Sequence, residues 1–205
     1  MDDVFYNGVS EKWKTEGRLP KHVVPLHYDL WLHPDLQRGL FKGHVKTIIK
    51  AKTAIDHLVV HTRNLTISEA GLYYLGGAEV PISSVFEYPA NDYWVMKLPR
   101  RVSKGMYLLN MKFNGSLTNG LNGLYKSVYK NADEKAIPIV ASQFEPTEAR
   151  KAFPCFDEPS FKATFTITLV RPSLGYIALS NMPVVEEVKD SPSIGRMIYR
   201  NKTFH

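Results

Sequence analysis

The chain has 205 residues, of which 44% are apolar and 22% are charged, a composition that is ordinary for a folded domain with one core. Its formal net charge is +6, but the basic residues are spread along the chain rather than concentrated, so the charge argues against nucleic acid as a partner. No stretch reaches the roughly eighteen apolar residues that a membrane-spanning helix requires, so we expect no membrane segment in this chain.

Residues 1–18, MDDVFYNGVSEKWKTEGR, form a polar lead-in without the apolar core of a signal peptide. We therefore expect the folded domain to cover residues 19–205. Asn64, Asn114 and Asn201 each begin an N-x-S/T sequon and are candidate N-glycosylation sites. These sequons favour a secretory or extracellular location, whereas the missing signal peptide leaves a cytoplasmic location open.

From residue 19 onward the hydrophobic pattern is that of short strands. Residues 27–36 alternate and place Tyr28, Leu30 and Leu32 on one face. Further runs are rich in β-branched and aromatic residues and are separated by Gly, Asn and Pro: 41–51, 57–75, 93–99, 106–117, 137–144, 161–172, 175–188 and 195–204. This series predicts an all-β fold, mainly antiparallel, built as a double sheet or sandwich.

One segment interrupts the strands. Residues 146–153, PTEARKAF, contain good helix formers, with Glu148 in the first turn and Lys151 near the end. Pro154 then stops the helix. We expect a single short helix near 147–153, of two turns at most.

The strand before this helix ends in a sharp change of chain direction, residues 143–158, which we call the corner and which could bind a ligand. Pro146 cannot continue a strand ladder, and it biases Glu145 towards an extended conformation. Gln143 and Glu145 are two residues apart, so their side chains leave the same face. A fixed carboxylate beside an amide suits a small cation such as an ammonium group. From the residues alone, a binding role and a structural role for Gln143 and Glu145 both remain open.

The residues after the helix favour a structural role. Arg150 and Lys151 are placed to pair with Asp157 and Glu158, which would close the corner as a clasp. Cys155 is the only cysteine, so it forms no intrachain disulfide. We expect it to be a small buried apolar side chain rather than a nucleophile, because the neighbouring acids would raise its pKa.

Residues 143–169, QFEPTEARKAFPCFDEPSFKATFTITL, strongly resemble the signature near the end of the N-terminal domain of M1-family zinc aminopeptidases. This is the gluzincin group that includes aminopeptidase N and the endoplasmic-reticulum aminopeptidases. Residues 19–36 and 41–51 resemble the first two strands of the domain, and GLYKSVY (123–129) resembles its Gly-aromatic-Tyr segment. The resemblance covers residues 19–205.

The resemblance implies a saddle-shaped β domain that packs on a thermolysin-like catalytic domain. It also implies a partner, the free α-amine of a peptide, which in this family is held by the residue at the position of Glu145. A second Glu, from a Gly-Ala-Met-Glu-Asn loop, completes that grip. The position of Gln143 lies beside the pocket for the first substrate side chain. The family's full-length enzymes use zinc to remove N-terminal residues from peptides.

The sequence contains neither HExxH nor the Gly-Ala-Met-Glu-Asn loop. His57 and His61 have i, i+4 spacing, but HLVVH lacks the Glu and is typical of a strand, so we expect surface or half-buried residues rather than ligands. We therefore assign no catalytic residue, no metal ligand and no bound cofactor to this chain, and zinc only to the full-length family enzyme.

Two functions follow from this reading. In the first, the chain is the substrate-anchoring domain of a zinc metalloaminopeptidase, inactive alone and incomplete without its catalytic domain. In the second, it is a stand-alone, non-catalytic β-sandwich that binds peptides or a partner chain. On the first reading we expect an exposed apolar face that promotes association, with a terminal strand near 195–204 at a sheet edge.

Overall fold

The computed structural model describes residues 12–15, 17–118, 120–172, 175–191 and 194–201. These residues form strands joined by short turns and three single-turn 3₁₀ helices, η1 (Lys12–Lys14), η2 (Pro89–Asn91) and η3 (Ala149–Lys151). The strands are β1 (Val23–Asp35), β2 (Leu40–Ala51), β3 (Ile55–His61), β4 (Leu65–Tyr74), β5 (Glu79–Val80), β6 (Ser84–Tyr88), β7 (Tyr93–Val102), β8 (Gly105–Ser116), β9 (Gly123–Lys130), β10 (Ala136–Gln143), β11 (Thr164–Pro172), β12 (Val184–Ser191) and β13 (Ile194–Asn201).

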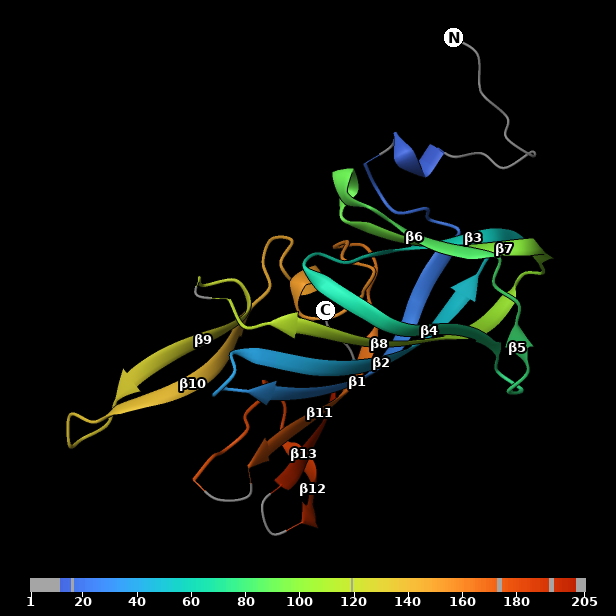
Figure 1. Ribbon diagram of the computed structural model, residues 1–205. Coiled ribbons are helices and arrows are strands. Elements are labelled where there is room, and N and C mark those ends of the chain that lie inside the picture. Colours follow the sequence, from blue (N-terminus) through green and yellow to red (C-terminus); the bar gives the residue numbers. More distant parts are fainter. Residues whose placement is uncertain (1–11, 16, 119, 173–174, 192–193, 202–205) are drawn as a thin grey trace.

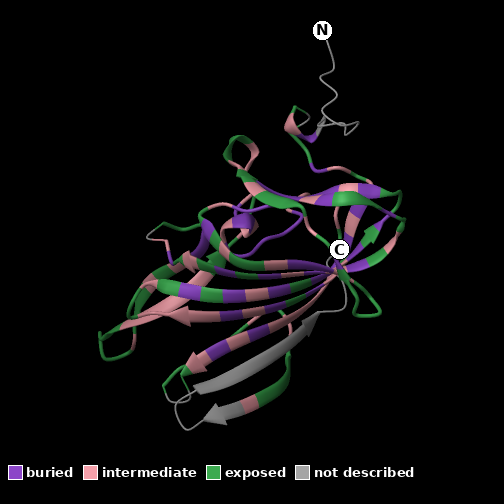
Figure 2. Ribbon diagram, turned by 45° about the vertical axis from the view of Figure 1, so that its right-hand side comes forward, coloured by how far each residue is buried: buried purple, intermediate pink, exposed green. Residues whose placement is uncertain are grey.

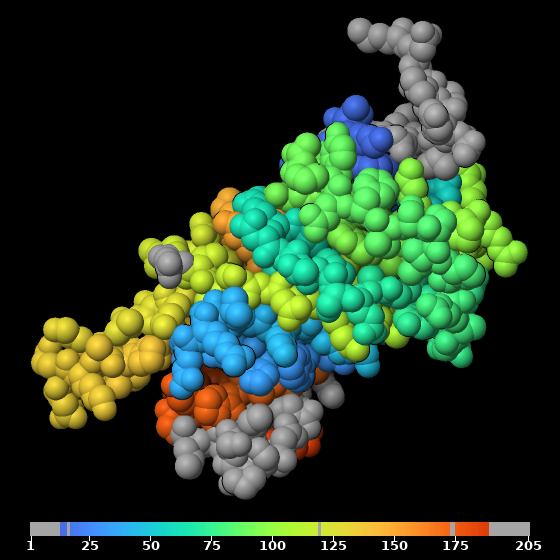
Figure 3. Space-filling view, in the orientation of Figure 1, coloured from blue at the N-terminus to red at the C-terminus, as the bar shows by residue number. Residues whose placement is uncertain are grey.

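The strands form two packed sheets and a projecting hairpin (Figure 1). An eight-stranded sheet has the order β12-β13-β11-β1-β2-β8-β4-β5, and the three-stranded sheet β3-β7-β6 covers one of its faces. The β9–β10 hairpin extends away from this body as an arm (Figures 1 and 3). Neighbouring strands are antiparallel except β1 and β11, which are parallel. The predicted all-β, mainly antiparallel double sheet is confirmed.

Alternation along the strands places the core between the sheets (Figure 2). On β2, Phe41, Val45 and Ile49 are buried, whereas Lys42 and Lys46 on the opposite face are exposed. The predicted inward face of β1 is confirmed as well, because Tyr28, Leu30 and Leu32 are all buried.

Three strand predictions need correction. The run 175–188 is a strand only in its last part, because residues 175–183 form no strand and β12 begins at Val184. The run 57–75 is two strands, because Asn64 adopts a positive φ of 57° and turns the chain between β3 and β4. The terminal strand is not at an edge: β13 lies between β11 and β12, and the edges of the large sheet are β12 and β5. Because β13 pairs with β11, the earlier strand of the β12–β13 hairpin takes the outer position.

The N-terminal segment contributes one large side chain to the core. Trp13 is 2% exposed and packs edge-on against Tyr88, with ring centroids 5.4 Å apart. The rings of Phe86 and Tyr93 lie within 6.4 Å of it. The polar lead-in therefore contacts the three-stranded sheet, and the domain start at residue 19 stays a prediction.

Candidate functional site

The predicted binding residues, Gln143 and Glu145, lie at the C-terminal end of β10, where the chain passes from the β9–β10 hairpin into the corner. Gln143 is the last residue of β10, opposite Gly123 of β9, and both Gln143 and Glu145 are exposed. Phe144 between them is half-buried and packs against Phe153, with ring centroids 6.2 Å apart. Because Phe144 points into the domain, its two neighbours are presented on the outside of the corner.

A tight turn follows. The backbone N–H of Glu148 donates to the carbonyl of Phe144 over 2.7 Å, and helix η3 begins directly afterwards. The helix expected near 147–153 is present but spans a single 3₁₀ turn, and the chain leaves it before Pro154. Prolines on either side leave little room for a longer helix.

The inner side of the corner is part of the core. The buried residues here are Ala152, Phe153, Cys155 and Phe156. The N–H of Phe156 donates to the hydroxyl of Tyr28 over 3.0 Å, which ties the corner to β1. The expectation for Cys155 is confirmed: burial and the nearby Asp157 raise the pKa of its thiol, so it stays protonated and unreactive.

Charged side chains brace the corner against the second sheet. The guanidinium of Arg150 donates to Asp157 over 2.9 Å and to Asp92 over 3.3 Å. Arg63 donates twice to the same oxygen of Asp92, over 2.7 and 2.9 Å, and once to Glu148 over 3.2 Å. We call these five residues the corner network. Arg63 and Asp92 were missed from the sequence because they lie far from the corner along the chain.

The charges in this network stabilise one another. Burial tends to raise the pKa of Asp92, but hydrogen bonds and charges from Arg63 and Arg150 outweigh burial and lower it. The hydrogen bond to Asp92 is also the main reason that the pKa of Arg63 is raised. Both groups therefore stay charged at neutral pH, and the pairs hold the corner on the body of the domain.

The predicted clasp is correct in one pair and different in the other. Arg150 pairs with Asp157 as expected. Lys151 instead lies 2.5 Å from the second carboxylate oxygen of Glu148. Glu158 accepts hydrogen bonds from Arg18 over 2.8 Å and from the backbone N–H of Leu19 over 3.0 Å.

Glu145 differs from the other acids of this corner. A peptide bond in the cis form joins it to Pro146. Within the described part of the chain, no side chain or backbone group forms an ion pair or hydrogen bond with the Glu145 carboxylate. The carboxylates of Glu148, Asp157 and Glu158 are all engaged by cations. Glu145 is thus available to a cation from outside the domain.

The two histidines of β3 are buried, contrary to the surface or half-buried positions expected. His57 is 8% exposed and His61 is 3% exposed, because β3 is covered on both faces. His57 pairs through Nδ1 with Asp56 over 2.6 Å. Nδ1 of His61 accepts the N–H of Asp157 over 3.2 Å, and burial, followed by the charge of Arg150, lowers the pKa of His61 to about 3.

The described residues do not fit a zinc site. Nowhere among them do three His, Cys, Asp or Glu side chains come together as a metal site requires. His57 and His61 lie on a strand, and each already has a hydrogen-bond partner within the domain.

The structure describes the side chains of two of the three candidate glycosylation sites. Asn64, in the turn before β4, and Asn114, on β8, are exposed, whereas the side chain of Asn201 lies outside the described residues. Glycosylation of all three stays a prediction. In the ranges that the structure describes, no helix has the length and apolar character to cross a bilayer.

Comparison with known proteins gives a consistent family of relatives. The profile of the peptidase M1 N-terminal domain matches residues 24–203. Human endoplasmic reticulum aminopeptidase 2 is 38% identical over 194 residues, which cover 91% of this chain and 20% of the relative. Human glutamyl aminopeptidase is 40% identical over 184 residues, which cover 87% of this chain and 19% of the relative. The chain thus spans about a fifth of the length of the curated relatives it matches.

Proposed function

The chain belongs to the peptidase M1 family, whose N-terminal domain it represents, and from this premise we propose that Gln143 and Glu145 hold the free N-terminus of a peptide substrate. In this proposal the Glu145 carboxylate faces the α-ammonium group, and the Gln143 amide lies beside the first side chain of the peptide. The observation that carries the proposal is the exposed Glu145 carboxylate, which the domain itself leaves unpaired.

The strength of this anchor follows from Coulomb's law. A carboxylate and an ammonium about 4 Å apart attract by about 1 kcal/mol in water and by about 4 kcal/mol at an effective dielectric constant of about 20. The open corner alone therefore supports millimolar binding at best. A closed site with a second carboxylate would raise the affinity, which is why we place the complete anchor between this domain and a catalytic partner.

The corner network makes the anchor rigid. Arg150 and Arg63 fix the turn that follows Glu145, and Phe144 fixes the chain that precedes it. A pre-organised carboxylate loses less conformational entropy on binding than one on a mobile loop. The full charge of Glu145 also favours a protonated amine over a blocked N-terminus.

The reaction of the whole enzyme is part of the proposal. The relatives are named as aminopeptidases, and we infer that the complete protein removes N-terminal residues from peptides with residues outside this chain. Since the described residues do not fit zinc, the chemistry of the metal would come from the catalytic domain. We expect the 205-residue chain alone to show no zinc-dependent hydrolysis of leucine p-nitroanilide.

Binding of a minimal amine tests the anchor directly. The ¹⁵N-labelled chain is titrated with leucine amide, which has a free ammonium group, and with N-acetyl-leucine amide, which has none. We expect saturable NMR shifts at Gln143, Phe144 and Glu145 with leucine amide only. Glu145→Gln should weaken binding at least about fivefold, which corresponds to the loss of the attraction of about 1 kcal/mol expected in water. Glu87→Gln, the same change at an exposed site on β6, should leave binding unchanged.

Three results would contradict the anchor: equal shifts with the acetylated amide, shifts confined to another surface, or unchanged affinity in Glu145→Gln. The coding sequence beyond residue 205 separates the two functional readings. A downstream HExxH would support the aminopeptidase domain, and a stop codon would support the stand-alone module.

A further inference from the structure

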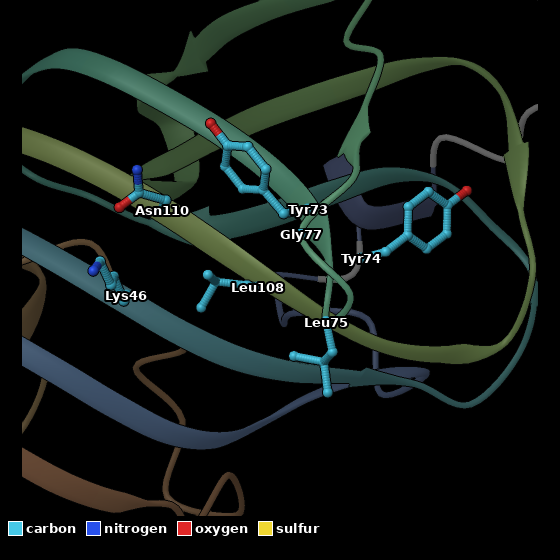
Figure 4. Close-up of a pocket in the computed structure, with 7 residues that line it drawn as sticks. All are labelled: Lys46, Tyr73, Tyr74, Leu75, Gly77, Leu108 and Asn110. Carbon is cyan, nitrogen blue, oxygen red and sulfur yellow. The ribbon is translucent and has the colours of Figure 1, made fainter.

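The outer face of the large sheet carries a hollow that the proposed anchor does not use. Its volume is about 270 Å³, and it lies between β2, β8 and the β4–β5 hairpin (Figure 4). Lys46 of β2 and Asn110 of β8 form its polar side, and Leu108, Leu75 and Tyr73 form its apolar side. All of these elements bury their other face in the core.

The polar side offers hydrogen-bond donors. Oδ1 of Asn110 lies 2.5 Å from Nε2 of His44, so the imidazole N–H donates to the amide oxygen. The amide NH₂ of Asn110 is then left to donate elsewhere. Among the described residues, neither the ammonium of Lys46 nor the hydroxyl of Tyr73 has an ion-pair or hydrogen-bond partner. Asp29 stands opposite Lys46 in register but forms no ion pair with it.

The apolar side has the shape of a shallow shelf. A Cβ at Gly71 would lie 2.7 Å from the Tyr73 hydroxyl, so the missing side chain lets the phenol ring lie along its own strand. Leu108 is directly opposite Tyr73 in the β4–β8 register, and Leu75 is 50% exposed. The hollow falls at the lower limit of ligand-pocket volumes, so it can take one ring-sized group rather than a larger molecule.

A ligand for this hollow must combine a negative charge, several acceptor oxygens and one apolar face. We propose that it binds an acidic sugar residue of a glycan. The carboxylate of the sugar would face Lys46 and the Asn110 amide, a ring hydroxyl would accept from Tyr73, and the C–H face of the ring would cover Leu108. Inorganic phosphate would leave the apolar shelf unused.

The surroundings support a glycan chain rather than a single sugar. Lys42 and Lys50 lie on the same face of β2 as Lys46, four residues to either side, or about 13 Å along the strand. Both are exposed and, within the described residues, carry no ion pair. An acidic glycan laid along β2 would meet these charges in turn.

Binding of defined oligosaccharides tests the proposal. The ¹⁵N-labelled chain from bacteria, in which Asn114 carries no sugar, is titrated with a hyaluronan tetrasaccharide and with neutral chitotetraose. We expect saturable shifts around Lys46, Tyr73 and Asn110 with hyaluronan only. Lys46→Gln should weaken binding tenfold or more, as expected for a lost charge-assisted hydrogen bond, and Tyr73→Phe should weaken it about threefold.

Lys135→Gln, at the exposed tip of the β9–β10 hairpin, is the matched control and should bind as the unmodified chain does. Circular dichroism checks that each variant is folded. The proposal is overturned if hyaluronan gives no shifts at about 5 mM, if chitotetraose binds equally well, or if Lys46→Gln has no effect. Tighter binding of a decathymidylate at the same residues would overturn it in favour of a nucleic-acid surface. None of these outcomes depends on Glu145.

Discussion

His61 should make the stability of this fold sensitive to acid. It is 3% exposed, and its Nδ1 accepts the backbone N–H of Asp157 over 3.2 Å, so the imidazole is neutral in the folded protein. Burial is the main reason that its pKa falls to about 3, and the positive charges of Arg150 and Arg63 act in the same direction. Asp92 opposes this shift only in part.

The sign and size of the effect follow from proton linkage. In the unfolded chain the imidazole has a pKa of 6.5 and takes up a proton as the pH falls below that value, whereas in the folded chain it stays neutral down to about pH 3. The stability that depends on neutral His61 is therefore fully present above pH 6.5 and is lost as the pH falls from 6.5 towards 3. At about 1.4 kcal/mol per pH unit, moving from about pH 7.5 to about pH 5.0 should cost about 2 kcal/mol.

Urea unfolding at these two pH values measures the cost. His61→Asn removes the titrating group and places an amide oxygen near the position of Nδ1, where it can still accept the Asp157 N–H. We expect the variant to be less stable at both pH values because it leaves a cavity, but to lose about 2 kcal/mol less than the unmodified chain between them.

Equal losses in His61→Asn and in the unmodified chain would refute this reasoning. Such a result would mean that the folded imidazole takes up a proton at the same pH as the unfolded one. The lowered pKa of His22 adds acid sensitivity in the same direction, but it is common to both proteins and cancels in the comparison.

Three further predictions concern packing, charge and surface. A Cβ at Gly43 would lie 2.1 Å from the ring of Phe113, so Gly43→Ala should lower the unfolding free energy by about 2 kcal/mol or more in urea titrations. Arg150→Met should cost about 3 kcal/mol, because the half-buried Asp157 carboxylate loses its buried cation partner. Ile177 and Leu179 are 80% and 77% exposed, so replacing both with Asp should reduce self-association measured by light scattering.

Each of these predictions has a control or a contradicting result. Gly76→Ala adds a Cβ in open space and should be close to neutral. Arg38→Met removes an ion pair whose arginine side chain is 80% exposed, so it should cost less than about 1 kcal/mol. If the unmodified chain is a stable monomer at high concentration, the apolar surface around Ile177 does not promote association.

Local pattern predicted the local structure well. Alternation identified the inward face of β1 because this strand has one face buried in the core and a less buried opposite face. The same rule failed for His57 and His61, because β3 is buried on both faces and its polar residues are satisfied internally. A continuous apolar run such as Leu58-Val59-Val60 is the signal for such a strand.

Pairings between segments that lie far apart along the chain could not be predicted from the sequence. Nothing local indicates that β1 pairs in parallel with β11, or that β13 lies inside the sheet. The corner network shows the same limit. Arg150 and Asp157 are seven residues apart, and their pairing was predicted, whereas Arg63 reaches Glu148 across 85 residues.

The corner network also accounts for the acidic residues that lie between β10 and β11 in a chain whose net charge is positive. Arg150 is buried and Arg63 is half-buried, and cations removed from water in this way require carboxylate partners. Asp92, Asp157 and Glu148 are therefore needed to keep both arginines within the fold. Glu145 meets no such need, because it is exposed and contacts none of these cations. Its negative charge therefore adds nothing to the corner network, so internal pairing does not account for an acid at this position, whereas the proposed binding of an external ammonium group would.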